Sequence, residues 1–138
     1  MSLGSLDPQR REGRLRLVFL MGFTGESKEY LVHISSRAAL AALEALGIDA
    51  IGLNCATGPA EMSEHLRHLS KHSPVPVTCM PNAGLPVLGK NGAEYPLSPA
   101  ELAAAHKQFV GEFGLSLVGG CCGTTPEHLR AVVDAVGG

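Results

Sequence analysis

The sequence predicts an α/β fold made of parallel βα units, and three observations support this prediction. Short apolar runs alternate along the chain with segments whose apolar residues recur at helical spacing. The apolar runs are continuous, which is typical of strands in a parallel sheet that is covered on both faces. The chain has 138 residues, enough to bury a core but fewer than the roughly 200 that a complete (β/α)₈ barrel requires.

The N-terminal third contains two expected elements. Residues 1–13 are rich in Gly, Ser and Arg and are expected to form a flexible lead-in, so that the domain spans residues 14–138. The apolar run at residues 17–21 predicts a buried strand. Ser36 is a candidate cap for a helix that Gly47 would end. Its apolar face would contain Leu40, Leu43 and Leu46.

The middle of the chain predicts a strand, a helix and a second strand. Residues 49–54 form a short apolar run that ends at Cys55. A helix is expected to follow it, with Pro59 at its first position. The inner face of this helix would contain Met62, Leu66 and Leu69. Residues 75–80 predict the second strand, and residues 81–97 predict a long loop rich in Gly and Pro.

The C-terminal part predicts two helices around one more strand. Ser98 and Glu101 have the spacing of a capping box, with Pro99 at the first helical position. A strand is expected at residues 115–118, and Thr124 or Thr125 is expected to cap the last helix. The helix after Ser98 is expected to have an inner face of Leu102, Ala105, Phe109 and Phe113. The last helix is expected to have an inner face of Leu129, Val132, Val133 and Val136.

Composition excludes several classes of protein. The chain is 45% hydrophobic and 17% charged, which is too apolar for a disordered tail. Its formal charge of −2 gives no reason to expect a protein that binds nucleic acid, which would usually have a basic stripe. No apolar run reaches the length of a membrane span. The first residues lack the apolar core of a secretory signal, so we expect a reducing, cytoplasmic setting.

Three of the four cysteines follow strands of the expected parallel sheet. Cys55 ends one strand, and Cys121 and Cys122 follow another. Since the carboxyl ends of parallel strands lie at one edge of the sheet, the three thiols can converge there. Three thiolates with one open position suit a tetrahedral zinc ion. The alternatives are small buried side chains, which we expect for Cys79, or a disulfide or redox pair at Cys121 and Cys122.

Other polar residues allow two interpretations each. His65, His68 and His72 share a helix flank, which is expected to be partly solvated rather than a second metal site. His128 lies behind the cysteine pair and is expected to act as a cap or surface residue rather than to support a metal. Tyr95 would either cover the thiols or pack within its loop.

The cysteine motifs resemble those of a known family. The runs Gly52–Cys55 and Gly119–His128, the latter containing GGCCGTTP, resemble the two zinc motifs of the homocysteine S-methyltransferase family. Pro81–Pro86 resembles the loop between those motifs. The likeness covers residues 47–138, whereas residues 1–34 give no convincing match.

The resemblance implies a (β/α)₈ barrel with Cys55, Cys121 and Cys122 as the three zinc ligands. The homocysteine thiol would take the fourth position, ionise there and attack an activated methyl group to give methionine. In the family members that the chain resembles most, the methyl group comes from methylcobalamin, which is recharged by 5-methyltetrahydrofolate on domains absent from this chain. Asn54, Asn82 and Gly84 become candidate substrate-binding residues, although Asn54 and Gly84 can also simply serve turns.

Against that family pattern, this chain would hold only the last three or four βα units. A half barrel exposes two sheet edges, so it must self-associate, pair with a complementary half, flatten into a layer or fold poorly. Three hypotheses follow. The chain is a zinc-binding piece of a homocysteine methyltransferase, a zinc-binding domain without catalysis, or a truncated gene product without activity.

Overall fold

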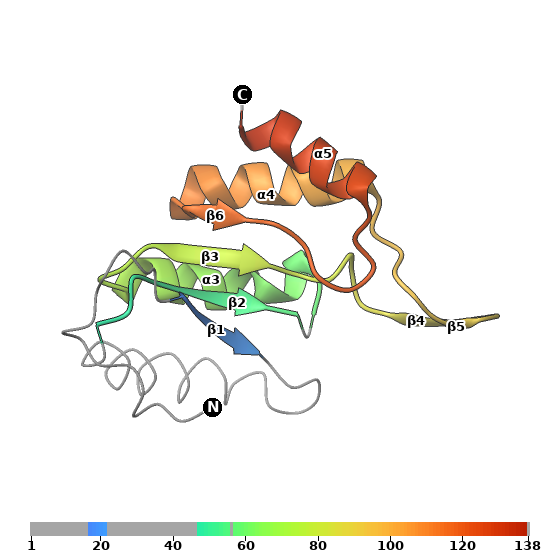
Figure 1. Ribbon diagram of the computed structural model, residues 1–138, viewed down its shortest axis with the longest axis horizontal. Coiled ribbons are helices and arrows are strands. Elements are labelled where there is room, and N and C mark those ends of the chain that lie inside the picture. Colours follow the sequence, from blue (N-terminus) through green and yellow to red (C-terminus); the bar gives the residue numbers. More distant parts are fainter. Residues whose placement is uncertain (1–16, 22–46, 56, 138) are drawn as a thin grey trace.

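The computed structural model describes residues 17–21, 47–55 and 57–137, and these form an α/β structure around one parallel sheet (Figure 1). The sheet contains β1 (Leu17–Met21), β2 (Ala50–Asn54), β3 (Val77–Met80) and β6 (Leu117–Val118), in the order β1-β2-β3-β6. The predicted α/β class with parallel strands is therefore confirmed. The expected lead-in at 1–13 and the expected helix before Gly47 lie outside the described residues.

The strand register brings chain segments distant in sequence to one edge of the sheet. Asn54 at the end of β2 pairs with Met21 of β1 and with Met80 of β3. Cys79 of β3 pairs with Val118 at the end of β6. All three pairings are parallel, so the segments after β2, β3 and β6 leave the sheet at the same edge.

The described segments contain three helices beside the sheet, and each begins with proline as the sequence predicts. They are α3 (Pro59–His72), α4 (Pro99–Phe113) and α5 (Pro126–Val136). Ser98 and Glu101 form the predicted capping box of α4. Thr125, rather than Thr124, caps α5, and its partner in the capping box is His128. These caps fix where α4 and α5 start relative to the preceding loops.

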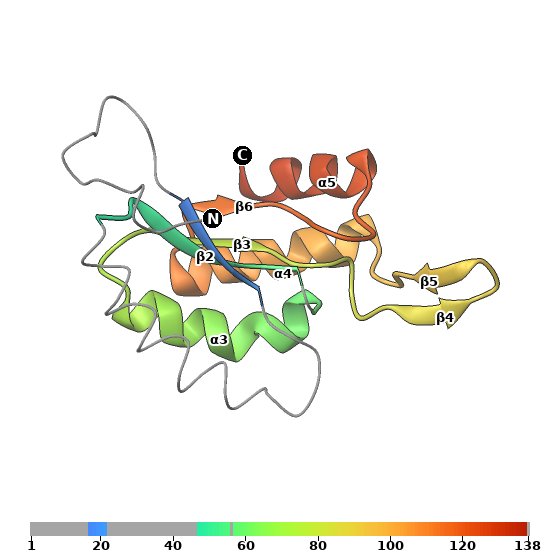
Figure 2. The ribbon, with the colours of Figure 1, turned by 60° about the horizontal axis from the view of Figure 1, so that its bottom comes forward.

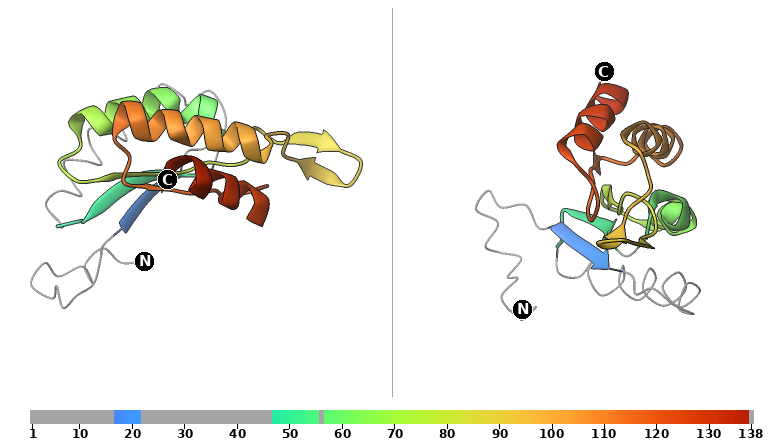
Figure 3. Two further views of the ribbon diagram at one scale, coloured as in Figure 1. Left: turned by 90° about the horizontal axis from the view of Figure 1, so that it is seen from above. Right: turned by 90° about the vertical axis from the view of Figure 1, so that its right-hand side faces the viewer.

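The main core lies between the sheet and two helices, since α3 and α4 cover the same side of the sheet (Figure 3). Its members alternate along β2 and β3, as expected when one face of each strand is packed against helices. The buried cluster contains Ile48, Ile51, Leu53, Met62, Leu66, Leu69, Val77, Cys79, Phe109 and Leu115. A second, smaller cluster joins α4 to α5 through Leu102, Ala103 and Val132.

The segment expected as a long loop contains a short hairpin instead. β4 (Val87–Gly89) pairs antiparallel with β5 (Gly92–Glu94), and the hairpin projects from the body of the molecule (Figure 2). The Gly- and Pro-rich composition of residues 81–97 correctly indicated turns. It did not predict the two strands, which have three residues each.

Two helix faces also differ from their predicted faces. On α5, Val132 is buried in the cluster shared with α4, whereas Leu129 and Val133 are exposed. On α4, Ala103 and His106 are buried, whereas Ala105 and Phe113 are half-buried. The helical spacing of apolar residues thus predicted the positions of these helices correctly. It did not predict which residues of each helix are covered by its neighbours.

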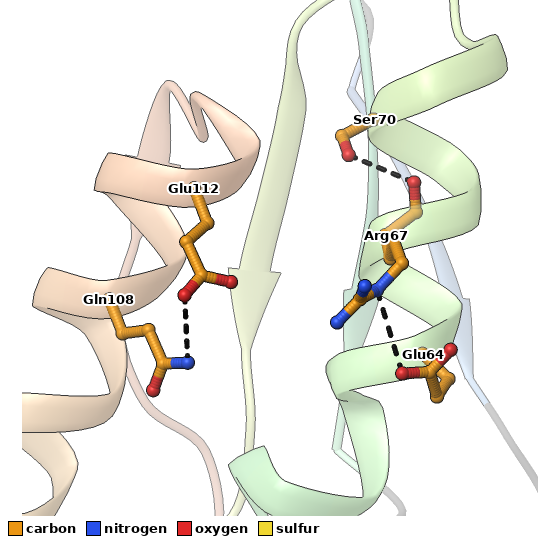
Figure 4. Close-up of polar contacts among 5 residues, drawn as sticks. All are labelled: Glu64, Arg67, Ser70, Gln108 and Glu112. Carbon is orange, nitrogen blue, oxygen red and sulfur yellow. Dashed lines mark hydrogen bonds and ion pairs between the residues drawn. The ribbon is translucent and has the colours of Figure 1, made fainter.

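The outer surfaces of α3 and α4 carry local polar contacts (Figure 4). Arg67 lies 3.5 Å from the carboxylate of Glu64, and Gln108 donates to Glu112 over 3.1 Å. The Arg67 guanidinium also lies 5.7 Å from the centre of the Phe113 ring, which links the two helices. Such exposed pairs contribute little to stability. Among the described residues, no helix is both long and apolar enough to cross a lipid bilayer.

Candidate metal centre

Three cysteine sulfurs converge at the carboxyl edge of the sheet. The Sγ atoms of Cys55 and Cys122 are 3.6 Å apart, and those of Cys121 and Cys122 are 3.9 Å apart. The three Sγ atoms all lie within 4.8 Å of one another. The four cysteines of the chain form no disulfide with one another, and Cys79 is fully buried in the core, as predicted. The topology therefore brings together residues separated by more than sixty positions in the sequence.

Backbone contacts place Cys55 beside the end of β3. Its N–H donates to the carbonyl of Met80 over 2.9 Å, which continues the β2–β3 pairing by one residue. Cys55 then takes a positive φ of 60°, and its carbonyl accepts from Thr57 over 2.8 Å. A left-handed conformation is uncommon for a residue other than glycine, and such residues cluster at functional sites. This turn ends the strand at the thiol and leads the chain away toward α3.

The segment Gly119–Thr124, called the metal loop here, is held by hydrogen bonds to β3 and to the residue that follows it. The N–H of Gly119 donates to Cys79 over 3.0 Å, and the N–H of Cys121 donates to Pro81 over 2.8 Å. Within the loop, the Thr124 hydroxyl donates to the carbonyl of Cys121 over 2.6 Å. Each contact uses a backbone group of the loop, so the cysteine side chains are left to face the cluster.

Asn82 supports the same loop from the neighbouring segment. Its side-chain oxygen accepts the N–H of Cys122 over 3.2 Å, while the N–H of Ala83 donates to the carbonyl of Cys122 over 2.9 Å. Asn82 itself is buried, with 4% of its surface exposed. Asn54 ends β2 next to Cys55, and Gly84 turns the chain with a φ of 91°. Of the three residues expected to meet substrate, Asn82 thus contacts the metal loop directly.

The ring of Tyr95 packs against the metal loop at Gly123. A Cβ atom on Gly123 would lie 2.3 Å from the Tyr95 side chain, and the φ of Gly123 is 80°, so only glycine fits this position. Desolvation, followed by the Coulombic effect of the neighbouring Cys122 side chain, raises the pKa of the Tyr95 hydroxyl. Tyr95 therefore packs against the metal loop at the residue that follows Cys122.

Burial and contact with its neighbours disfavour ionisation of the Cys121 thiol when no cation is present. Desolvation, followed by hydrogen bonds with Cys55 and Cys122, raises the pKa of Cys121 to about 11. Desolvation alone raises the pKa of Cys79 to about 12. A divalent cation among the three clustered sulfurs would supply the positive charge that favours thiolates.

The spacing of the sulfurs fits a zinc ion. A tetrahedral site with Zn–S distances of about 2.3 Å separates its sulfurs by about 3.8 Å. Two of the observed separations, 3.6 Å and 3.9 Å, lie on either side of that value. Within the described part of the chain, no other set of three metal-ligating side chains converges in this way. His65, His68 and His72 accordingly form no such set.

Two buried histidines flank the metal loop. His128, expected as a cap or surface residue, is indeed a cap but is buried. Its Nδ1 accepts the N–H of Thr125 over 3.2 Å, and its Nε2 lies 2.7 Å from the carbonyl oxygen of Leu97. His106 was not predicted as a site residue. The available signal was its place four residues after Leu102, on the inner face of its helix.

Comparison with known proteins agrees with this geometry. A family model described as homocysteine S-methyltransferase matches residues 7–136. The chain is 62% identical over 134 residues to the methionine synthase of Mycobacterium leprae (strain TN). It is 61% identical over 134 residues to the methionine synthase of Mycobacterium tuberculosis (strain ATCC 25618 / H37Rv).

These matches also correct one expectation and define the extent of the likeness. The family match begins at residue 7, so residues 1–34, which gave no convincing match by their motifs, are largely included. Each alignment covers 97% of this chain but only 11% of the methionine synthase that it matches. The match covers nearly all of the chain and includes all three clustered cysteines, and the chain therefore belongs to the homocysteine S-methyltransferase family.

Proposed function

We propose that this chain is the zinc-binding part of a homocysteine S-methyltransferase of the methionine synthase type, and that it forms part of a (β/α)₈ barrel. Cys55, Cys121 and Cys122 would hold Zn²⁺, and homocysteine would be the substrate that is methylated to methionine. The observation that carries the proposal is the convergence of three thiols within 4.8 Å at the carboxyl edge of a parallel sheet. The similarity to two methionine synthases supports the choice of substrate.

The residues around the thiols would position the reacting groups rather than move protons. A bound zinc ion would act as a Lewis acid that ionises the substrate thiol at the position left open by three cysteines. No general base is then required in the chain. Asn82 would keep the Cys122 backbone in place, and Asn54 and Gly84 would border the substrate at the same edge of the sheet. Tyr95 would limit the access of water from the side of Gly123.

The methyl donor belongs to other parts of a larger protein in this proposal. The chain spans 11% of the length of the methionine synthases that it matches. We therefore assign methylcobalamin and 5-methyltetrahydrofolate to domains outside these 138 residues. A reducing cytoplasm would keep Cys55, Cys121 and Cys122 as thiols that are available to a metal.

The proposal is tested by the zinc content of the purified chain and of single-cysteine variants. We expect about one zinc per chain, retained in Cys79→Ser and lost in Cys121→Ser and Cys122→Ser. Cys79→Ser is the matched control, because this thiol is buried outside the cluster. A folded chain that binds no zinc would overturn the proposal. Zinc binding that homocysteine does not perturb would favour the alternative of a zinc-binding domain without catalysis.

A further inference from the structure

His106 is a buried side chain that contacts the base of the metal loop. It lies on α4, is completely inaccessible to solvent, and its Nε2 is 2.7 Å from the carbonyl oxygen of Gly119. A carbonyl oxygen can only accept, so the ring nitrogen must carry the hydrogen of this bond. Neutral His106 is therefore the Nε2–H tautomer.

This bond acts at the residue where the metal loop begins. Gly119 immediately follows β6 and precedes Cys121 by two positions. Its N–H is already bound to the carbonyl of Cys79, so the contact with His106 fixes the opposite side of the same residue. With both backbone groups of Gly119 held, the direction in which the chain leaves β6 toward the cysteine pair is determined.

The other ring nitrogen of His106 is not used for hydrogen bonding within the described residues. Nδ1 of His106 is buried and has no hydrogen-bond partner within the part of the chain that the structure describes. The ring instead meets Phe109 edge-on, with 6.2 Å between the ring centres. A buried polar nitrogen without a partner lowers the stability of the fold. The fold keeps His106 buried despite this cost, and the one hydrogen bond of the ring goes to the metal loop.

We propose that His106 is a positioning residue of the metal centre, whose Nε2–H holds the carbonyl of Gly119 and thereby aims Cys121 and Cys122 at Cys55. This inference rests on the proposed function, because it concerns the same zinc site. His106 touches none of the three thiols in this role and acts through the backbone of the loop. Outer contacts of this kind commonly change metal affinity by about ten- to a hundredfold.

The test compares zinc affinity across variants of the full chain, with a chromophoric chelator as competitor. His106→Met removes the donor at similar size, and we expect zinc to bind at least about tenfold more weakly. His106→Gln restores an N–H at nearly the same position, and we expect an affinity close to wild type. With Co²⁺ as the probe, His106→Met should also change the sulfur-to-cobalt absorption bands, whereas His106→Gln should not.

Two controls separate a role in positioning from a loss of stability. Val132→Ala shortens a buried side chain of the α4–α5 cluster, and it should lower stability without changing zinc affinity. His72→Leu replaces an exposed histidine of α3 and should change neither. If His106→Met does not fold, the zinc affinity of His106→Gln tests the inference. Weak zinc binding by folded His106→Gln would overturn the inference.

The outcomes also distinguish this inference from the proposed function. A wild-type chain without zinc would contradict the proposed function itself. A wild-type chain that binds zinc, together with a His106→Met variant of unchanged affinity and unchanged cobalt spectrum, would overturn the positioning role alone.

Discussion

Cysteine occupies two different environments in this molecule. Cys79 lies within β3, is fully buried and contacts the sulfur of Met62 at 3.9 Å, so it behaves as a small apolar side chain. Cys122 lies on the metal loop and is exposed, while Cys55 and Cys121 are half-buried beside it. The difference follows from position, because Cys79 faces the helices whereas the other three leave the sheet at its carboxyl edge.

This contrast predicts how the thiols of the metal-free chain react with iodoacetamide. Cys122 should be alkylated first, whereas Cys79 should stay unmodified in the native state, because it is buried and its pKa is raised to about 12. Mass spectrometry of peptides after a timed reaction measures both rates. Alkylation of Cys79 at a rate similar to that of Cys122 would contradict the buried position of β3.

His106 gives stability a dependence on pH with a definite sign. Burial lowers its pKa below the ordinary value of 6.5, and the bond to Gly119 offsets this only in part. An unfolded chain therefore takes up the proton at higher pH than the folded chain does. The stabilisation is complete above 6.5 and is lost as the pH falls through the lower pKa of the folded state.

We accordingly expect the metal-free chain to have a smaller free energy of unfolding at about pH 5.5 than at about pH 7.5. Urea titrations at both values measure the difference, and it should be smaller in His106→Gln, which does not titrate. Glu101 and Glu127 have pKa values lowered below 4.5, so both remain ionised across this range. An identical pH dependence in the Gln variant would show that His106 is not the titrating group.

The elements differ in how they depend on glycine. In the metal loop, Gly123 has a positive φ and lies against the Tyr95 ring, whereas Gly111 lies within α4 with open space where a Cβ would be. Gly123→Ala should therefore destabilise the metal-free chain by more than about 2 kcal/mol. Gly111→Ala should stabilise it by about 0.5–1 kcal/mol, because alanine favours helix.

Urea unfolding of the two glycine variants measures both effects on one chain. The opposite signs make Gly111→Ala the matched control for Gly123→Ala. Equal stability of the two variants would mean that Tyr95 does not pack against the metal loop as the structure shows.

The sequence was sufficient to predict the helices and the parallel strands that lie in the described residues. Proline at each helix start, the capping box at Ser98 and continuous apolar runs are local signals, and the elements follow them. The hairpin was not predictable, because strands of three residues in a Gly-rich segment carry too weak a pattern. The exposure of Leu129 and Val133 depends on which neighbours reach α5, and that is a tertiary property.

Different reasoning found different parts of the candidate site. The thiol cluster could be anticipated because strand ends in a parallel sheet share an edge. The contact between His106 and Gly119 could not, because histidine on an inner helix face has no spacing rule that names its partner. The same holds for the bond from Cys122 to Asn82, which joins residues forty positions apart.

At the scale of the whole molecule, the described sheet is open at both edges. β1 pairs only with β2, and β6 pairs only with β3, among the described strands. Exposed apolar side chains occur on β6 and on α5, namely Leu117, Leu129 and Val133. Open edges and exposed apolar side chains favour association, either with a complementary half barrel or with a second copy of the chain.

We therefore expect the isolated chain to elute above its monomer mass of 14.4 kDa in size-exclusion chromatography with light scattering. Leu129→Lys combined with Val133→Lys should shift it toward monomer, because charge on an apolar contact surface opposes association. Leu88→Lys, on β4 of the projecting hairpin, is the matched control for an exposed apolar residue elsewhere. A compact, stable monomer of the unmodified chain would contradict this expectation.

The central claim, that three cysteines form a zinc centre for a substrate thiol, is tested most directly by X-ray absorption at the zinc edge of the zinc-loaded chain. We predict three sulfur neighbours at about 2.3 Å without homocysteine and four when homocysteine is added. A cysteine ligand set that does not gain a sulfur on addition of homocysteine, or zinc surrounded by nitrogen and oxygen, would contradict the account.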